Sequence, residues 1–221
     1  MAADGKGAAA LRDRATALGS SVIGDAFGKK GHLSAALSRI NGEGVFAGPA
    51  RTAKCATGSV ASLLEALLTS EPGQVLVVQG DGEFAYVGEL LGAEAARRGV
   101  AAIVVDGYVR DSARLPLLDL HVHALGLTPR GAKLGEPGEG EVPLSVGETT
   151  VNPGDWVIGD GDGLVAIPAD ELAAVLELAE AVDAEEAEVW ERLRAGVPMS
   201  EQPGSYGEAI RSVEAGFKDR T

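Results

Sequence analysis

The sequence has a single cysteine, Cys55, among its 221 residues. An intramolecular disulfide needs two cysteines, so the fold is not cross-linked in that way, and no cysteine pair is present to hold zinc. Aromatic residues are also scarce, at 4%, although 45% of the residues are hydrophobic. We therefore expect a core made mainly of alanine, valine, leucine and isoleucine, as suits helices packed on a β-sheet.

The sequence has few basic residues for its size. It contains 19 lysines and arginines against 33 aspartates and glutamates, and its formal net charge is −14. Proteins that bind nucleic acids contact phosphates through clustered lysine and arginine, and no basic run is present here. The composition therefore argues against a nucleic-acid partner and against an anionic membrane surface.

Long apolar runs are also missing. A membrane-spanning helix needs roughly 20 consecutive apolar residues, and no stretch approaches that length. The first residues, 1–7, include Asp4 and Lys6 and lack the apolar run of a secretory signal. From these features we expect a cytoplasmic protein.

The middle of the chain has the clearest structural pattern. Val75–Val78 is a short apolar run typical of a strand buried on both faces. Leu90–Arg98 has the composition of a helix, which Gly99 ends, and Val100–Val105 is a second apolar run. Two strands joined by a helix form a βαβ unit, so these strands are expected to be parallel with a right-handed crossover.

The flanking segments complete an α/β fold. A helical region is expected at Leu11–Gly28, hairpin-forming antiparallel strands at 142–167, and a long helix from Ala169 to about Ala195. We predict one catalytic domain over residues 1–168. Residues 169–221 are predicted to form a helical extension that packs on this domain or on a neighbouring subunit.

Candidate site residues follow the two strands of the βαβ unit. One loop leads into Gly88 and Glu89 at a helix start, and the other carries Arg110 and Asp111, with twenty residues between Glu89 and Arg110. Ligands of parallel α/β sheets bind beyond the carboxyl ends of the strands. The two segments should therefore face each other.

These residue types suit a 2-oxo acid. Backbone N–H groups of Gly88–Leu91 favour a carboxylate, and the planar cation of Arg110 can grip a carboxylate or an enolate oxygen. Asp111 is an oxygen ligand suited to a Mg²⁺-type ion, and Glu89 could order a water or transfer a proton. An Arg-Asp pair after a strand is also often only a surface ion pair of little energetic weight.

The motif that contains these residues resembles a known family. The segments Gly88–Leu90, Arg98–Val100 and Val104–Asp111 are similar to class II 4-hydroxy-4-methyl-2-oxoglutarate aldolases, a family that also includes the regulator of ribonuclease activity A. The resemblance runs from about Ser20 to Pro168. It includes four further segments: Gly48–Thr52, Pro72–Val78, Val151–Val157 and Asp162–Pro168.

The resemblance implies an α/β/β/α sandwich that assembles as a homotrimer, or as a dimer of trimers, with active sites at subunit interfaces. It implies Mg²⁺ or Mn²⁺ as cofactor and retro-aldol cleavage that releases pyruvate. It also implies a side activity as an oxaloacetate decarboxylase, because both reactions pass through the pyruvate enolate.

The resemblance also assigns roles to residues. By likeness, Asp111 binds the metal, Arg110 holds the keto or carboxylate end of the substrate, and Glu89 positions a water. The backbone from Gly88 through Leu90 to Leu91 takes the pyruvate carboxylate. An acidic residue of the neighbouring subunit's C-terminal helix is a further family feature, for which Glu185, Glu186 and Glu188 are all candidates.

Two alternatives from the same family remain. The ribonuclease-regulator branch resembles this fold but lacks the full catalytic pattern, so a non-catalytic regulatory binding protein is the second hypothesis. Some members have been called menaquinone methyltransferases, but no glycine-rich fingerprint for S-adenosylmethionine is present.

Other reactive residues have simpler interpretations. His121 and His123 face the same side of a strand, and without a third ligand we expect them at a partly solvated face. Asp160–Gly163 suggests a tight hairpin turn rather than a calcium loop. Cys55 has no spaced catalytic partner and is expected to be a small buried residue. Lys54 could form a Schiff base in a metal-independent aldolase, although an edge lysine is the simpler explanation.

Overall fold

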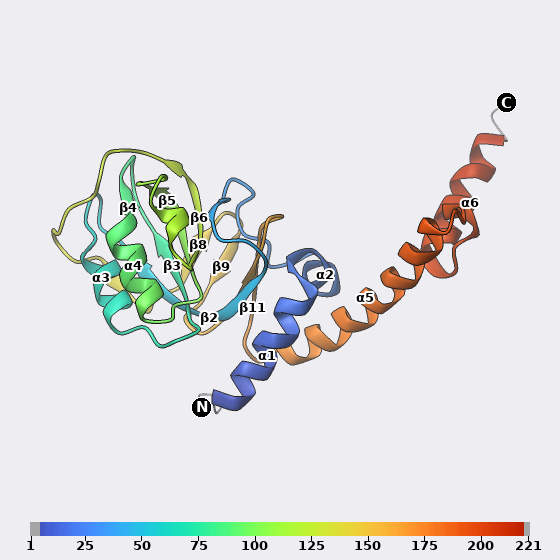
Figure 1. Cartoon of the computed structure of the whole chain (residues 1–221), viewed down its shortest axis with the longest axis horizontal. Coiled ribbons are helices and arrows are strands. Elements are labelled where there is room, and N and C mark those ends of the chain that lie inside the picture. Colours follow the sequence, from blue (N-terminus) through green and yellow to red (C-terminus); the bar gives the residue numbers. More distant parts are fainter. Residues whose placement is uncertain (1–4, 219–221) are drawn as a thin grey trace.

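The computed structural model describes residues 5–218. It consists of a body of strands and helices and a helical arm that projects from it (Figure 1). The α-helices are α1 (Gly5–Leu18), α2 (Ser20–Ala26), α3 (Ala61–Leu68), α4 (Glu89–Arg97), α5 (Leu172–Arg194) and α6 (Gly204–Lys218), with short 3-10 turns η1 (Leu115–Leu117) and η2 (Met199–Glu201). The strands are β1 (Ser38–Asn41), β2 (Phe46–Lys54), β3 (Val75–Gln79), β4 (Ala85–Val87), β5 (Ala102–Val109), β6 (His121–Leu127), β7 (Glu139–Gly140), β8 (Leu144–Val146), β9 (Thr149–Val151), β10 (Trp156–Gly159) and β11 (Leu164–Ile167).

The main sheet contains the predicted βαβ unit. Strands β3 and β5 pair in parallel, with Val77 opposite Val104, and α4 is the connection between them. The order across the sheet is β1-β6-β5-β3-β2-β10-β11, with β4 on β5 and β7 on β2. Strand β2 pairs in parallel with β3 and antiparallel with β10, so this one strand connects the two halves of the curled sheet.

Three buried clusters separate four layers, which confirms the mixed α/β fold. The first lies between the sheet and helices α3 and α4 and includes Leu63, Leu76 and Ile103. The second lies between the two β-layers, where Val77 of β3 meets residues of β8–β11 such as Leu144. The third holds α1, α2 and α5 against β10 and β11. Nearly every member is aliphatic, as the scarcity of aromatic residues requires.

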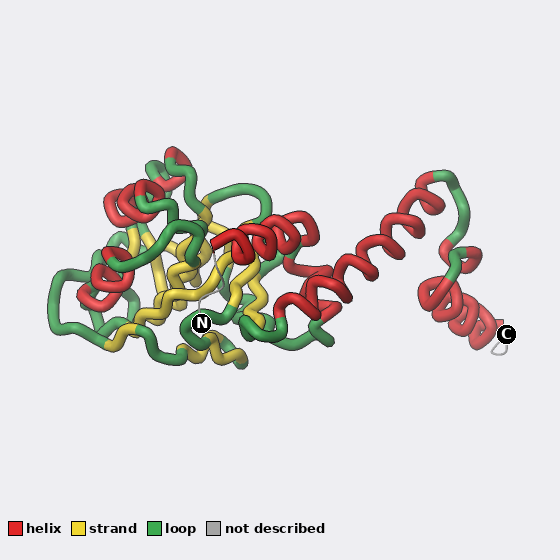
Figure 2. Tube along the Cα trace, turned by 90° about the horizontal axis from the view of Figure 1, so that it is seen from below, coloured by secondary structure: helices red, strands yellow, loops and turns green. Residues whose placement is uncertain are grey.

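The C-terminal helices form an arm. The first half of α5 packs on α1 and α2 and buries Leu172, Val175, Leu176 and Ala179, whose helical spacing places them on one face. Its second half leaves the body and carries α6 (Figures 1 and 2). Within the arm, Gln202 is 1% exposed and accepts a 2.9 Å hydrogen bond from Arg192. No helix in residues 5–218 is both long and apolar enough to cross a bilayer.

The structure corrects one sequence interpretation. His123 does not lie at a partly solvated face, because it packs beside Phe46 and against the backbone carbonyl of Asp160, whereas His121 is partly exposed as expected. The side chain of His123 is 1% exposed. Asp160–Gly163 is the predicted hairpin turn, since it joins the antiparallel strands β10 and β11.

Candidate functional site

The two predicted site segments lie side by side. Strand β5 ends at Val109, and the next residues, Arg110 and Asp111, lie against the start of α4. The backbone N–H of Glu89 donates a 3.0 Å hydrogen bond to Oδ2 of Asp111, and the N–H of Arg110 donates a 2.9 Å bond to the carbonyl of Val87. The chain therefore brings together Gly88–Leu91, Arg110 and Asp111 as the sequence predicts.

Asp111 adopts a backbone conformation that few residues favour. Its φ is +63°, in the left-handed region, which aspartate tolerates better than most residues with a side chain. This conformation turns the carboxylate onto the first turn of α4, where free N–H groups and the helix dipole stabilise a negative charge. Asp111 thus caps the helix from a neighbouring segment, because the residue before the helix, Gly88, supplies no side-chain cap.

Gly88 is held against the Asp111 carboxylate. A Cβ atom built on Gly88 would lie 2.2 Å from Oδ2 of Asp111 and 3.0 Å from Cγ of Arg110. No side chain fits in that space without moving Asp111. The first turn of α4 therefore approaches the Arg-Asp pair through bare backbone.

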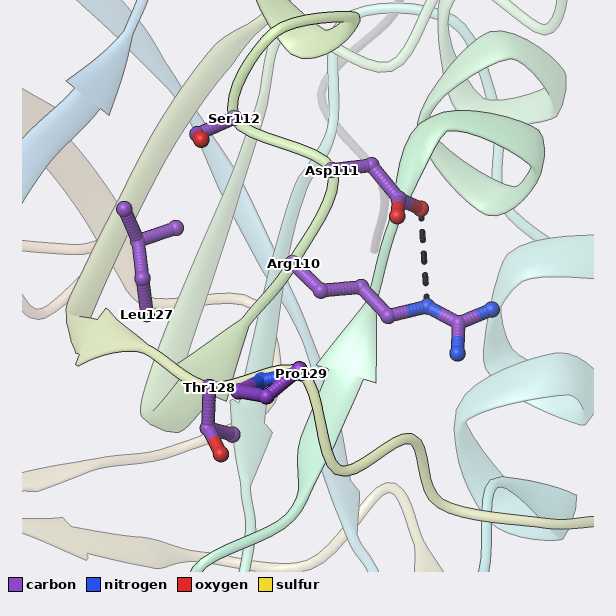
Figure 3. A pocket seen from close by; sticks show the side chains of 6 residues that line it. All are labelled: Arg110, Asp111, Ser112, Leu127, Thr128 and Pro129. Carbon is purple, nitrogen blue, oxygen red and sulfur yellow. Dashed lines mark ion pairs between the residues drawn. The ribbon is translucent and has the colours of Figure 1, made fainter.

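The side chain of Arg110 is directed towards the carboxylate of Asp111 (Figure 3). Its Nε is 3.4 Å from Oδ2 of Asp111, and 47% of its side chain is exposed. The segment after β6 closes the other side, since Arg130 and Ala132 hydrogen-bond Ala85 through their backbones. A Cβ on Gly131 would lie 2.4 Å from Nη1 of Arg110, so this glycine also leaves room for the guanidinium.

Glu89 has a partner that the sequence did not indicate. Its carboxylate lies 3.3 Å from Nε of Arg114, and both side chains are partly exposed. An exposed pair of this kind adds only about 0–1 kcal/mol to stability. Its local effect is to hold the Glu89 carboxylate at the edge of the site.

Two cavities meet at the Arg-Asp pair. The larger, about 340 Å³, is lined by Arg110, Asp111, Ser112, Leu127, Thr128 and Pro129 (Figure 3). The smaller, about 180 Å³, is mostly apolar and is lined by Val60, Ala85, Tyr86, Val87, Gly88, Leu90, Leu91, Arg110, Asp111 and Ala132. A ligand that bridges the two cavities would contact Arg110 at its centre. Sequence reasoning missed Ser112, Thr128 and Gly131, because they come from segments without a recognisable spacing.

The site can hold a cation only through few protein ligands. In residues 5–218, no three His, Cys, Asp or Glu side chains group closely enough to hold a metal together. Asp111 offers one carboxylate, 32% exposed. Such a site fits Mg²⁺, which keeps several of its waters and often takes only one or two protein carboxylates.

The first turn of α4 offers backbone N–H groups that differ in availability. The N–H of Glu89 is already used by Asp111. The N–H groups of Leu90 and Leu91 lie in the first helical turn, where no intrahelical acceptor exists. The N–H groups of Leu90 and Leu91 therefore remain for an anion, whereas that of Glu89 does not.

The remaining candidates lie elsewhere. Lys54 is half exposed, 3.9 Å from Glu139, which fits an edge lysine. Cys55 is buried as predicted, and burial raises the pKa of its thiol, which disfavours the reactive thiolate. Glu186 accepts a hydrogen bond from Tyr206 within the arm, which lies on the far side of the body from α4 (Figures 1 and 2).

Sequence comparisons agree with the motif. The model of the RraA-like family, described as Aldolase/RraA, matches residues 20–166. A protein of Halalkalibacterium halodurans described as a candidate 4-hydroxy-4-methyl-2-oxoglutarate aldolase is 32% identical over 166 residues, which cover 74% of this chain and 79% of that protein.

Solved structures have the same fold. The RraAS2 protein of Streptomyces coelicolor, an unusual member of a family of RNase ES inhibitors, is 30% identical with a TM-score of 0.73, covering 86% of this chain and 98% of that one. A Geobacillus kaustophilus protein described as an S-adenosylmethionine:2-dimethylmenaquinone methyltransferase is 32% identical with a TM-score of 0.64, covering 68% and 95%.

Proposed function

Because the chain belongs to the Aldolase/RraA family, we propose that it is a divalent-metal-dependent aldolase that cleaves a 4-hydroxy-2-oxo acid to release pyruvate. The substrate we propose is of the 4-hydroxy-4-methyl-2-oxoglutarate type. The observation that supports this most is the Arg110–Asp111 pair held over the bare first turn of α4.

Substrate binding follows from the groups at the cavity walls. The carboxylate of the pyruvyl half accepts hydrogen bonds from the N–H groups of Leu90 and Leu91, and its methylene carbon lies against the apolar wall of the smaller cavity. Arg110 then reaches the keto oxygen with its planar guanidinium cation. The rest of the substrate occupies the larger cavity, beside Ser112 and Thr128.

Asp111 is the residue we propose to hold the divalent ion through its carboxylate. When bound, Mg²⁺ or Mn²⁺ supplies a Lewis acid that withdraws charge from the 2-oxo group as it becomes an enolate. Arg110 adds a fixed positive charge on the same oxygen, already oriented before the reaction begins. Arg110 would thus stabilise the charge that develops when the carbon–carbon bond breaks, and a bound ion would add to this effect.

The cleavage requires two proton movements. The hydroxyl on C4 loses its proton as the C3–C4 bond breaks, which gives the departing carbonyl compound and leaves the bonding electrons on the pyruvate enolate. C3 then gains a proton to give pyruvate. Glu89 is the proposed positioning group for the water that carries these protons, and Arg114 holds its carboxylate in place.

Oxaloacetate should react at the same site. Its decarboxylation breaks the C3–C4 bond, releases CO₂ and leaves the same enolate. We therefore propose oxaloacetate decarboxylation as a side activity that needs the same Arg110 and Asp111.

We propose that the chain works as a homotrimer or a dimer of trimers with the site at a subunit interface. Leu90 and Leu127 line the two cavities and are 76% and 51% exposed, and Leu134, in the segment that follows Ala132 of the smaller cavity, is 75% exposed. Large apolar side chains this exposed beside a binding site are typical of a surface that a partner covers. A neighbouring subunit would also bring its arm, in which α5 contains Glu185, Glu186 and Glu188 and, within one chain, points away from the body (Figure 1).

A regulatory binding protein is the second candidate. It is favoured by the 30% identity to RraAS2 over 98% of that chain. This function would not need Asp111 to bind a metal. Retained partner binding in a variant without metal binding would support it.

The deciding experiment measures pyruvate release from 4-hydroxy-4-methyl-2-oxoglutarate and from oxaloacetate, with Mg²⁺ and with EDTA. We expect release that requires the metal and that falls by at least about 100-fold in Asp111→Ala. Asp170→Ala, an exposed aspartate at the start of the arm, is the matched control and should keep full activity.

Each other result has a definite meaning. Release that survives EDTA would replace the metal mechanism with Schiff-base chemistry at a lysine such as Lys54. An inactive protein that binds a ribonuclease would favour the regulatory function.

A further inference from the structure

A second polar pocket lies on the opposite side of the sheet from α4. Its volume is about 370 Å³, and its walls include Ser38, Arg39, His123, Asp160 and Asp162. None of these residues belongs to the Arg110–Asp111 site. They come from β1, β6 and the turn between β10 and β11, so three separate parts of the chain converge there.

His123 forms part of the wall with an unsatisfied nitrogen. Its Nε2 is 2.9 Å from the backbone carbonyl of Asp160. A carbonyl oxygen only accepts hydrogen bonds, so Nε2 carries the proton and Nδ1 carries a lone pair. Nδ1 is buried and has no hydrogen-bond partner among residues 5–218. Burial also lowers the pKa of His123, which keeps the ring neutral and Nδ1 an acceptor.

Arg39 is the cross-strand neighbour of His123. Its guanidinium lies against the turn, because a Cβ on Gly161 would be 3.3 Å from Nη1 of Arg39. No carboxylate in the described part of the chain lies within ion-pair distance of it, although Asp160 and Asp162 flank Gly161. A cation and two anions thus face one pocket without pairing.

The carboxylates of Asp160 and Asp162 differ in how many hydrogen bonds they already accept. Asp160 accepts hydrogen bonds from the N–H and the hydroxyl of Ser20, at 2.7 and 2.6 Å, and from the N–H of Asp162. Asp162 is exposed and, among residues 5–218, accepts only from the hydroxyl of Ser21, at 3.1 Å on Oδ2. Asp162 therefore keeps an oxygen that can accept from a ligand.

We propose that this pocket binds a small α-amino acid in its zwitterionic form. The carboxylate of the ligand accepts from Arg39, whose planar fork suits two parallel hydrogen bonds. The ammonium group donates to Asp162 and lies beside the ring of His123 in the pocket wall. A simple anion satisfies only Arg39 and is repelled by the aspartates, and a simple cation is repelled by Arg39, so a ligand with both charges fits best.

This inference does not rest on the proposed lyase activity, because it uses none of the catalytic residues. The test follows the imidazole ¹⁵N resonances of the native protein at pH 7.5 during titration with glycine or L-alanine. The chain has only three histidines, and the missing signal of His123→Phe assigns the relevant pair. Acetate and methylammonium, each with one of the two charges, are added in parallel at equal ionic strength.

We expect glycine or L-alanine to shift the Nδ1 resonance of His123 saturably, and the single-charge compounds to leave it in place. Arg39→Gln should weaken binding by at least about tenfold, a loss of about 1.4 kcal/mol. Arg194→Gln, an exposed arginine on the arm, should bind like the native protein. Arg39 is exposed, so its variant tests the site even if His123→Phe folds poorly.

Two results would overturn the proposal. One is the absence of a saturable shift with any small amino acid. The other is an equal shift with acetate, which would make the pocket a simple anion site.

Discussion

Glycine is the only residue type that fits at position 88 without a shift of Asp111. Substitution to alanine places a Cβ 2.2 Å from Oδ2 of Asp111, so the carboxylate must move. Displacement of a catalytic group by about 1 Å can cost on the order of 100-fold in rate. We expect Gly88→Ala to lower kcat/KM for pyruvate release by about that factor, with an unchanged far-UV circular dichroism spectrum.

Gly216→Ala is the control for this substitution, because no atom lies within 4 Å of a Cβ built there. It should retain native kinetics. Full activity in Gly88→Ala would show that the position of the Asp111 carboxylate does not matter for the reaction.

The two strand histidines make stability depend on pH. Burial lowers the pKa of both His121 and His123 in the folded protein. The unfolded chain, with an ordinary histidine pKa of about 6.5, then binds protons more readily than the folded chain. Stability should be full above about pH 6.5 and fall as the pH drops through the lowered folded values.

Urea denaturation between pH 7.5 and 5 measures this effect. His123→Phe, which places a second ring beside Phe46, should reduce the dependence of the unfolding free energy on pH in this range. An unchanged slope in the variant would assign the pH dependence to other groups.

At the scale of the element, α5 is attached to the body by one face of its first half. Leu176 is 0% exposed, whereas Leu178, two residues later, is 58% exposed. Leu176→Ala should lower the free energy of unfolding by about 2–5 kcal/mol, because it leaves a cavity in the cluster with α1 and α2.

Leu178→Ala serves as its matched control and should change the unfolding free energy by less than about 0.5 kcal/mol. Chemical denaturation of both variants measures the difference. Equal effects would mean that the exposed face of α5 is also covered in solution, as in an assembly of several chains.

Periodicity was most informative for elements whose neighbours in space are also neighbours in sequence. The β3–α4–β5 unit was predicted because both strands are apolar runs and a glycine follows the helix. Because the two strands are parallel, the residues that follow them meet at one edge of the sheet, and Glu89 therefore lies beside Asp111. The short strands β4 and β7 were missed, because two or three residues have no periodicity.

Long-range packing explains the remaining errors. His123 is buried against Phe46 and the backbone carbonyl of Asp160, both far from it in sequence, which a strand pattern does not reveal. The position of Gly131 beside Arg110 likewise depends on backbone bonds to Ala85, 46 residues earlier (131 − 85). Neither contact leaves a local signal.

At the scale of the whole molecule, the exposed leucines around the site predict assembly. We expect light scattering after size exclusion to give a mass three or six times the 22.5 kDa of one chain. Leu134→Glu, a 75% exposed position outside the catalytic groups, should shift the equilibrium towards smaller species and reduce activity in parallel. An active monomer would contradict a site completed by a neighbour.

Strand β2 also determines how the body can come apart. Its parallel partner β3 belongs to the half that carries the Arg110–Asp111 site, and its antiparallel partner β10 belongs to the half that anchors the arm. Detaching either half breaks the ladder of β2 and exposes apolar surface in the cluster between the β-layers. The two halves should therefore unfold together rather than independently. Hydrogen exchange at the amides of β2 should proceed only through global opening, as in a single cooperative foldon.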